Sequence, residues 1–142
     1  MSIEHLIQQD AYTGVGYSPV VDYGAWRVAV LNFHPELLPE NISHFQCHRE
    51  TDEVFVLLSG TCRLYVAEPH PEDPDRIETI HAVDMKPKQI YTIRRGVYHS
   101  HTPSEDASIL IVENRDTGDV NSNDIELTEA QRTRLQETLQ EI

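Results

Sequence analysis

Short stretches of apolar or alternating residues recur along most of the chain, and turn-forming residues separate them. The most apolar stretch covers residues 54–58 and ends at Ser59-Gly60. Many short strands divided by turns are typical of a β-sandwich or β-barrel. The pattern therefore predicts an all-β domain. Its other expected strands cover residues 26–33, 42–48, 61–67, 76–82, 89–94, 98–101 and 107–113.

The segments outside these stretches are not expected to form strands. Residues 68–75 hold three prolines and four acids, which favours a solvated loop. Residues 114–124 are poor in apolar side chains and are expected to form a surface linker. Thr128 and Gln131 have the spacing of a helix capping box, so a helix is expected from there to the C-terminus. We therefore expect an N-terminal arm at 1–25, a barrel at 26–114, and a linker with a short C-terminal helix at 115–142.

Charge and composition exclude several classes of function. The 142 residues include 11 basic and 24 acidic side chains, a formal net charge of −13. This balance disfavours binding to nucleic acid or to an anionic membrane. No apolar run is long enough to span a bilayer, and residues 1–10 lack the pattern of a signal peptide. The only cysteines, Cys47 and Cys62, are too few for a disulfide framework, so we expect free thiols and a cytoplasmic location.

Polar side chains suited to metal binding flank the most apolar stretch. Alternation along 42–48 puts His44, Gln46 and His48 on one face, with Cys47 on the other. Glu53 opens the next strand. Polar groups buried beside an apolar strand need a partner, and a metal ion is one. Far downstream, His99 follows a glycine turn and adds a further imidazole.

The spacing in this region resembles the first motif of the cupin superfamily. That motif reads His, any residue, His, three or four residues, Glu, six residues and Gly. Here it reads Gln46, one residue, His48, four residues, Glu53, six residues and Gly60, so Gln46 occupies the first His position. The stretch also resembles small single-domain bacterial cupins. The resemblance implies a double-stranded β-helix, also called a jelly roll or cupin barrel.

The second cupin motif is only partly present. It reads Gly-x5-Pro-x-Gly-x2-His-x3-Asn, and Gly96 and His99 match its second Gly and its His. Lys88 stands at the first Gly of that motif, Arg94 at its Pro and Pro103 at its Asn. The two motifs nevertheless occur in the family's order, between expected strands.

By this resemblance the metal ligands are His48, Glu53 and His99, with Gln46 as a fourth. The ligand chemistry supports this independently of the resemblance. Two imidazoles and one carboxylate suit divalent iron, manganese, nickel or zinc, and they leave positions open for water or substrate. Gln46 could coordinate through its amide oxygen, hold a metal-bound water, or leave the site depleted. His44 and His101 are reserve ligands. The alternative is a buried, hydrogen-bonded His48–Glu53 pair without metal.

The function expected is binding of a divalent metal in the barrel and of a small polar molecule at its mouth. Whether the protein is an enzyme stays open. Dioxygenase, isomerase, epimerase and decarboxylase chemistries all occur on this fold, and the weak candidates for an acid–base group are Tyr98, His44 and His101. The alternatives are a sensor or carrier without turnover, and a metal-free structural cupin. By the family resemblance, a homodimer is expected.

Overall fold

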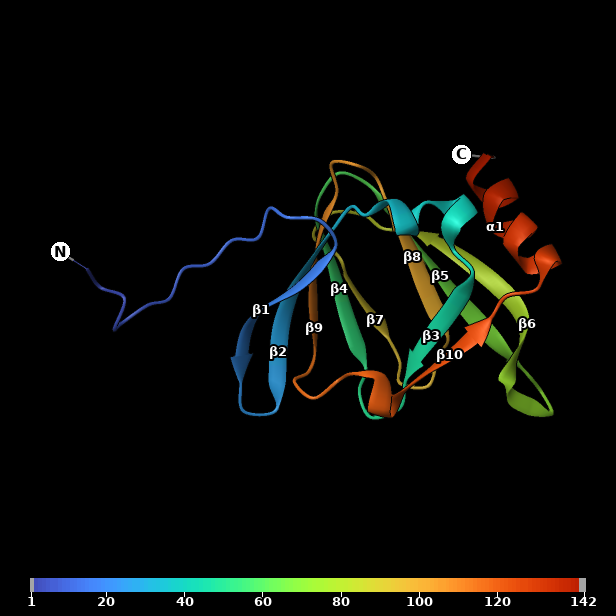
Figure 1. The fold of residues 1–142 in the computed structure, drawn as a ribbon, viewed down its shortest axis with the longest axis horizontal. Helices are drawn as coiled ribbons and strands as arrows, with labels where there is room; N and C mark the ends of the chain where they lie inside the picture. The colour runs from blue at the N-terminus through green and yellow to red at the C-terminus, as the bar shows by residue number, and fades with distance from the viewer. Residues whose placement is uncertain (1, 141–142) are drawn as a thin grey trace.

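Two five-stranded antiparallel sheets face each other in the computed structural model, which describes residues 2–140. Sheet A has the strand order β1-β2-β9-β4-β7, and sheet B has the order β10-β3-β8-β5-β6. Consecutive strands thus alternate between the sheets through much of the chain, as in a double-stranded β-helix (Figure 1). The expected all-β architecture, with one short C-terminal helix, is confirmed. Within residues 2–140, no helix is long and apolar enough to cross a bilayer.

Ten strands, three short 3-10 turns and one helix make up the fold over residues 2–140. Sheet A contains β1 (Tyr17–Tyr23), β2 (Trp26–Asn32), β4 (Glu53–Ser59), β7 (Ile90–Ile93) and β9 (Ser108–Asn114). Sheet B contains β3 (His44–His48), β5 (Cys62–His70), β6 (Asp73–Asp84), β8 (His99–Pro103) and β10 (Ser122–Glu126). The remaining elements are η1 (Pro35–Leu37), η2 (Pro39–Asn41), η3 (Asp119–Asn121) and α1 (Glu129–Gln140).

Two apolar clusters hold the layers together. The first lies between the sheets and includes Phe55, Leu57 and Ile109. The second lies on the other side of sheet B, where Phe45 and Tyr65 pack with Leu135 of α1. Each of these six side chains is almost completely buried. Helix α1 therefore covers the outer face of sheet B (Figure 1).

The outer face of sheet A is also apolar, and no helix within residues 2–140 covers it. The strand register aligns Val28, Val112 and Val54 in one row across the sheet. A second row holds Val30, Leu110, Val56 and Ile90. These seven residues, here called the aliphatic face, are half-buried or exposed. Antiparallel sheets usually expose a polar outer face to water, so this composition indicates a surface that another element covers.

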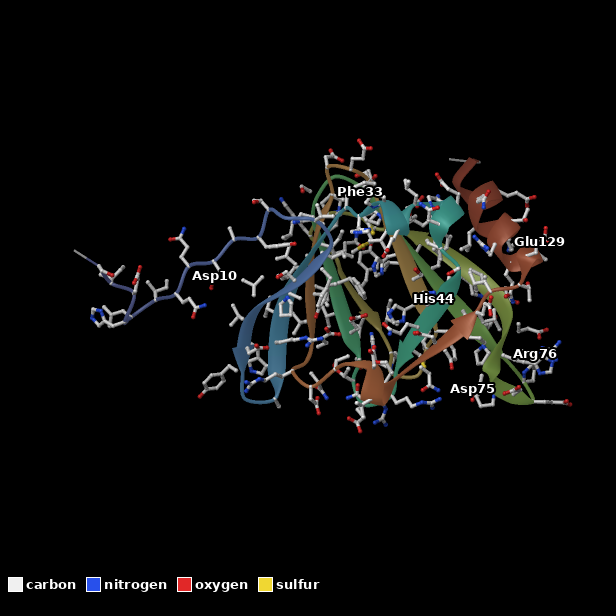
Figure 2. The ribbon with its side chains drawn as sticks, viewed as in Figure 1. Asp10, Phe33, His44, Asp75, Arg76 and Glu129 are labelled. Atoms are coloured by element: carbon white, nitrogen blue, oxygen red, sulfur yellow. The ribbon has the colours of Figure 1, made fainter. Side chains whose placement is uncertain are left out.

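The structure extends the sheets beyond the expected barrel. Strand β1 lies within the expected arm and pairs with β2, and β10 begins within the expected linker, extends past its end and pairs with β3. The expected solvated loop at 68–75 is wrong in extent, because β5 runs to His70 and β6 starts at Asp73. Figure 2 shows Asp75 near the tip of this long hairpin. Residues 1, 141 and 142 of the expected arm and helix lie outside the described part.

The capping box and the motif glycines behave as their sequence positions predict. Thr128 and Gln131 exchange side-chain-to-backbone hydrogen bonds at 2.9 and 3.2 Å, which starts α1. Gly60 and Gly96 have φ angles of +67° and +79°. Lys88, at the first Gly position of the second cupin motif, has a φ of +69°. The backbone thus keeps at Lys88 a left-handed conformation that glycine adopts more easily.

We predict that Gly60→Ala destabilises the protein more than Gly24→Ala. Both glycines have positive φ, which costs an alanine about 1–2 kcal/mol. A Cβ at Gly60 would also lie 2.6 Å from the Cα of Ala107, whereas nothing lies within 4 Å of one at Gly24. The total loss at Gly60 should reach roughly 3 kcal/mol. Urea unfolding measures both variants, and equal losses would contradict the proposed clash.

Candidate metal centre and cavity

His48, Glu53 and His99 come together between the two sheets from three different strands. One ligand atom from each side chain lies within 4.8 Å of the other two. The Nε2 atoms of His48 and His99 lie 3.4 and 3.0 Å from the same oxygen, Oε1 of Glu53. All three side chains are over 90% buried. Ligands bonded to one metal ion at about 2.0–2.2 Å lie roughly 3–3.5 Å apart, so these spacings fit a shared ion.

A backbone hydrogen bond determines which nitrogen of His99 faces the site. Nδ1 of His99 lies 2.9 Å from the carbonyl oxygen of Val97. A carbonyl only accepts, so Nδ1 carries a proton, and the neutral ring has its lone pair on Nε2. That lone pair faces the Glu53 carboxylate oxygen at 3.0 Å. Two acceptors this close require a positive charge, either a proton on Nε2 or a metal ion.

A polar contact from the neighbouring strand also orients His48. Ser122 of β10 lies directly opposite His48 in the register, and its Oγ is 2.8 Å from Nδ1. Metal-binding histidines commonly use their second ring nitrogen in this way, to hold the ring and its tautomer. Nε2 of His48 is thereby directed toward Glu53. The donor set and its supporting contacts thus fit a divalent metal ion.

Of the other candidate site residues predicted from the sequence, three lie beside the cluster and one lies elsewhere. Gln46 and the reserve ligands His44 and His101 line the cavity with the three-residue cluster. Gln46 lies directly opposite His99 in the register, and Figure 2 labels His44 on the same strand, β3. Tyr98 lies elsewhere: it belongs to the apolar cluster beneath α1, and its hydroxyl donates to Asp75 at 2.9 Å.

The cavity beside the cluster has a volume of about 340 Å³. Phe55 of the first apolar cluster packs against two of the histidines that line it, with its ring 6.2 Å from that of His99 and 5.8 Å from that of His101. His101 has a buried Nδ1 without a hydrogen-bond partner in the described structure. Burial lowers the pKa of His101 to about 4, so this ring is neutral at physiological pH.

A second polar cluster on sheet A lines the same cavity and consists of Tyr17, Arg27 and Glu113. We call it the Glu113 clamp. Oε1 of Glu113 accepts hydrogen bonds from the Tyr17 hydroxyl at 2.5 Å and from Nε and Nη2 of Arg27 at 3.1 and 2.7 Å. Oε2 is buried and accepts no hydrogen bond from residues 2–140. The carboxylate is therefore fixed through one oxygen and leaves the other free.

Burial and neighbouring charges move the pKa values of the two glutamates in opposite directions. Burial alone would raise the pKa of Glu53, but its hydrogen bonds to His48 and His99 hold it well below 4.5. Burial raises the pKa of Glu113, and the adjacent Glu53 raises it further, to about 7, although Tyr17 and Arg27 act against this. Burial would lower the pKa of His48, but its contact with Glu53 raises it. Glu53 is therefore the ionised member of the acidic pair.

Sequence reasoning did not identify the clamp or Ser122. Arg27 and Glu113 are 86 positions apart and meet only because β2 pairs with β9 in this register. A weak signal was present, since each is a charged residue at an inward position of an otherwise apolar alternating strand. Ser122 had no such signal, because β10 is polar throughout most of its length.

We predict that Glu113→Gln removes a pH-dependent loss of stability from the metal-free protein. The folded-state pKa of Glu113 is about 7, against an ordinary value of 4.5. The wild type should therefore lose stability relative to Glu113→Gln as the pH rises from 5 to 7, with little change above. The pKa of Glu53 lies below this window, and His48 titrates in both proteins.

Urea unfolding with chelator at pH 5, 6, 7 and 8 measures the difference between the two proteins. Glu105→Gln, at an exposed position, is the matched control and should follow the wild type. A constant difference between wild type and Glu113→Gln across these pH values would contradict the raised pKa.

Solved structures share this fold at low sequence identity. Pac13, a nucleoside dehydratase, is 10% identical over 84% of this chain and 88% of its own, with a TM-score of 0.53. Oxalate decarboxylase of Bacillus subtilis is 14% identical, with a TM-score of 0.50, and the match covers 75% of this chain but only 25% of the decarboxylase. A cupin-2 domain protein of Shewanella frigidimarina is 20% identical over 72% of this chain and 85% of its own, with a TM-score of 0.49.

No protein-family model matches the chain, and no curated protein matches it in sequence. The strand order and the structural matches to Pac13 and oxalate decarboxylase therefore identify the fold. The motif that runs from Gln46 to Gly60 predicted the same architecture. The chain has the cupin fold.

Proposed function

We propose that this protein binds a divalent transition metal ion through His48, Glu53 and His99, and a small polar molecule in the adjoining cavity. The observation that carries the proposal is the pair of facing acceptors, Nε2 of His99 and Oε1 of Glu53, at 3.0 Å. The Val97 carbonyl fixes the proton of His99 on the opposite nitrogen. A metal ion satisfies both acceptors without a second proton on the ring.

The donor set supports iron, manganese, nickel or zinc rather than calcium or magnesium. Two imidazole nitrogens and one carboxylate suit divalent transition metals, whereas the two hard cations take oxygen ligands. Gln46 is the proposed fourth contact, because it lies opposite His99 and lines the cavity. Three protein ligands leave room for water or ligand, and a bound ion would act there as a Lewis acid.

The fold does not select the chemistry of the small molecule. Variants of Streptomyces Pac13 have been solved with uridine, an uncharged ligand, whereas oxalate decarboxylase takes its name from a dianion. The volume of about 340 Å³ supports a small ligand, since pockets for drug-sized molecules span about 300–1,000 Å³. Catalysis would require a group within reach of that ligand, and His44, His101 and Glu113 line the same cavity.

The second candidate is a cupin that holds no metal. In that case His99 carries protons on both nitrogens and forms an ion pair with Glu53. The raised pKa of His48 favours this candidate, because it shows that Glu53 also stabilises a protonated imidazole. The two candidates differ in whether the positive charge in the site is a proton or a metal ion.

We predict that the protein binds one metal ion per chain. Binding should depend on the proposed ligands and, to a smaller degree, on the hydrogen bond that orients His48. Protein purified without a metal-affinity tag and stripped with chelator is titrated calorimetrically with zinc, manganese or cobalt. His48→Ala should abolish binding, since one of three ligands is lost. Ser122→Ala should weaken it by about 10- to 100-fold, because it removes only the contact that orients His48.

The matched control for this titration is His44→Ala. His44 lines the same cavity but lies outside the cluster of ligand atoms, so its removal should leave the affinity unchanged. If the wild type binds none of the three ions while remaining folded, the metal-free candidate is correct. If His48→Ala binds as tightly as the wild type, the ion occupies a different site.

We further propose that the protein is a homodimer that joins two copies through their aliphatic faces. The two rows of aliphatic side chains contain no charged residue, so the formal charge of −13 does not place like charges opposite each other there. The N-terminal segment supports a second copy as the occupant. It projects away from its own sheets (Figure 1) and exposes Ile3, Leu6 and Ile7 by 55, 74 and 62%.

We also propose a cytosolic location for the protein. Its two cysteines are buried free thiols, which is consistent with a reducing compartment.

We predict that Val56→Lys converts the dimer to monomers. Val56 lies centrally in its row, so two-fold packing of sheet A on sheet A would bury the new charge without a partner. Light scattering after size-exclusion chromatography should show the mass fall to that of one chain, 16.3 kDa. Val120→Lys, at a fully exposed position outside sheet A, is the control and should stay dimeric. A monomeric wild type would refute the proposed interface.

A further inference from the structure

The Glu113 clamp and the candidate metal centre are neighbours across sheet A. Arg27 lies directly opposite Glu113, and Val112 lies opposite Val54. One residue further along each strand, Glu113 adjoins Glu53. A ligand in the cavity can therefore contact the clamp and the metal centre at the same time. No part of the proposed metal site requires the clamp, so its arrangement needs an explanation of its own.

The clamp leaves one buried carboxylate oxygen free for a ligand. The side chain of Glu113 is 2% exposed, and all three of its hydrogen bonds with Tyr17 and Arg27 reach Oε1. The second oxygen, Oε2, is buried and accepts no hydrogen bond from residues 2–140. A buried acceptor without a donor is costly, which favours a donor supplied by the ligand.

The charge of Arg27 is already neutralised within the protein. Its Nε and Nη2 donate to Glu113, Nη2 also donates to the Thr117 carbonyl, and Nη1 donates to the Arg115 carbonyl. Arg27 is the one lysine or arginine among the described residues that line the cavity. The ionisable acids Glu53, Glu113 and Asp119 line it too. An anionic ligand would thus meet acids and no free guanidinium.

We propose that the Glu113 clamp is a ligand-binding subsite that takes an uncharged, hydroxyl-bearing molecule and disfavours carboxylates and phosphates. A ligand hydroxyl donates to Oε2 of Glu113, while Tyr17 and Arg27 hold the carboxylate in place through Oε1. The inference rests on the proposed function, because its ligand is the small molecule proposed for this cavity. It adds the chemical class of that molecule, which the fold does not supply.

The test compares matched neutral and anionic probes on metal-free protein at pH 8. Erythritol and ribitol are the neutral probes, and meso-tartrate and ribarate are the dicarboxylates with the same carbon chains. Binding is followed by changes in the protein's NMR spectrum. The wild type should bind each polyol at least about tenfold more tightly than its matched acid, the effect of one charge-assisted hydrogen bond.

Two variants separate ligand recognition from a merely structural role. Glu113→Gln replaces the free acceptor by a donor and leaves Arg27 without its counter-charge, so polyol binding should fall about tenfold and the acids should bind more tightly than in wild type. Glu105→Gln, at an exposed position outside the cavity, is the matched control and should preserve the preference for polyols. The spectra also report whether each variant is folded.

Either of two results overturns the inference: acids that bind the wild type as tightly as polyols, or polyols that do not bind at all. An unchanged preference in a folded Glu113→Gln protein would also overturn it. Because chelator is present throughout, the outcome is independent of the metal titration. A protein that binds metal but prefers acids refutes this inference alone. One that prefers polyols but binds no metal refutes only the metal part of the proposed function.

Discussion

The arrangement at the centre of this protein depends on one buried carboxylate, Glu53, which two imidazoles approach through the same oxygen. An ionised carboxylate in an apolar interior is tolerated only when positive charge and hydrogen bonds compensate it. The Val97 carbonyl and the Ser122 hydroxyl fix the two rings from behind. The neighbouring Glu113 then requires a compensation of its own, which Arg27 and Tyr17 provide. The polar contacts around the two imidazoles thus compensate the burial of Glu53.

The sequence predicted the parts of this arrangement that local pattern encodes. Alternation along β3 placed Gln46 and His48 on one face, and the motif that ends at Gly60 predicted the fold. Contacts that depend on register between distant strands, such as Arg27 with Glu113, could not be read in this way. Lys88 occupies a glycine position of the second cupin motif and still has a left-handed φ. The backbone there matches the motif although the residue type does not.

The two sheets differ in how their outer faces are covered. Sheet B has α1, whose Leu135 is almost completely buried against it. Sheet A carries aliphatic rows on its outer side and the first core cluster on its inner side. The strand that contributes Glu113 to the cavity also contributes Leu110 and Val112 to the aliphatic face. A substitution in β9 can therefore affect the proposed ligand site and the proposed dimer interface together.

The strand order also constrains when the chain can fold during synthesis. Strand β2 pairs with β9, and β3 pairs with β8 and β10, so neither sheet is complete before residues 108–126 have left the ribosome. Pairings this distant in sequence are slow to form and leave apolar strands exposed meanwhile. His99, Glu113 and Ser122 belong to these late strands. The candidate metal centre and the cavity therefore form only at the end of folding, and a nascent chain without its last strands lacks the residues that would bind a ligand and stabilise it.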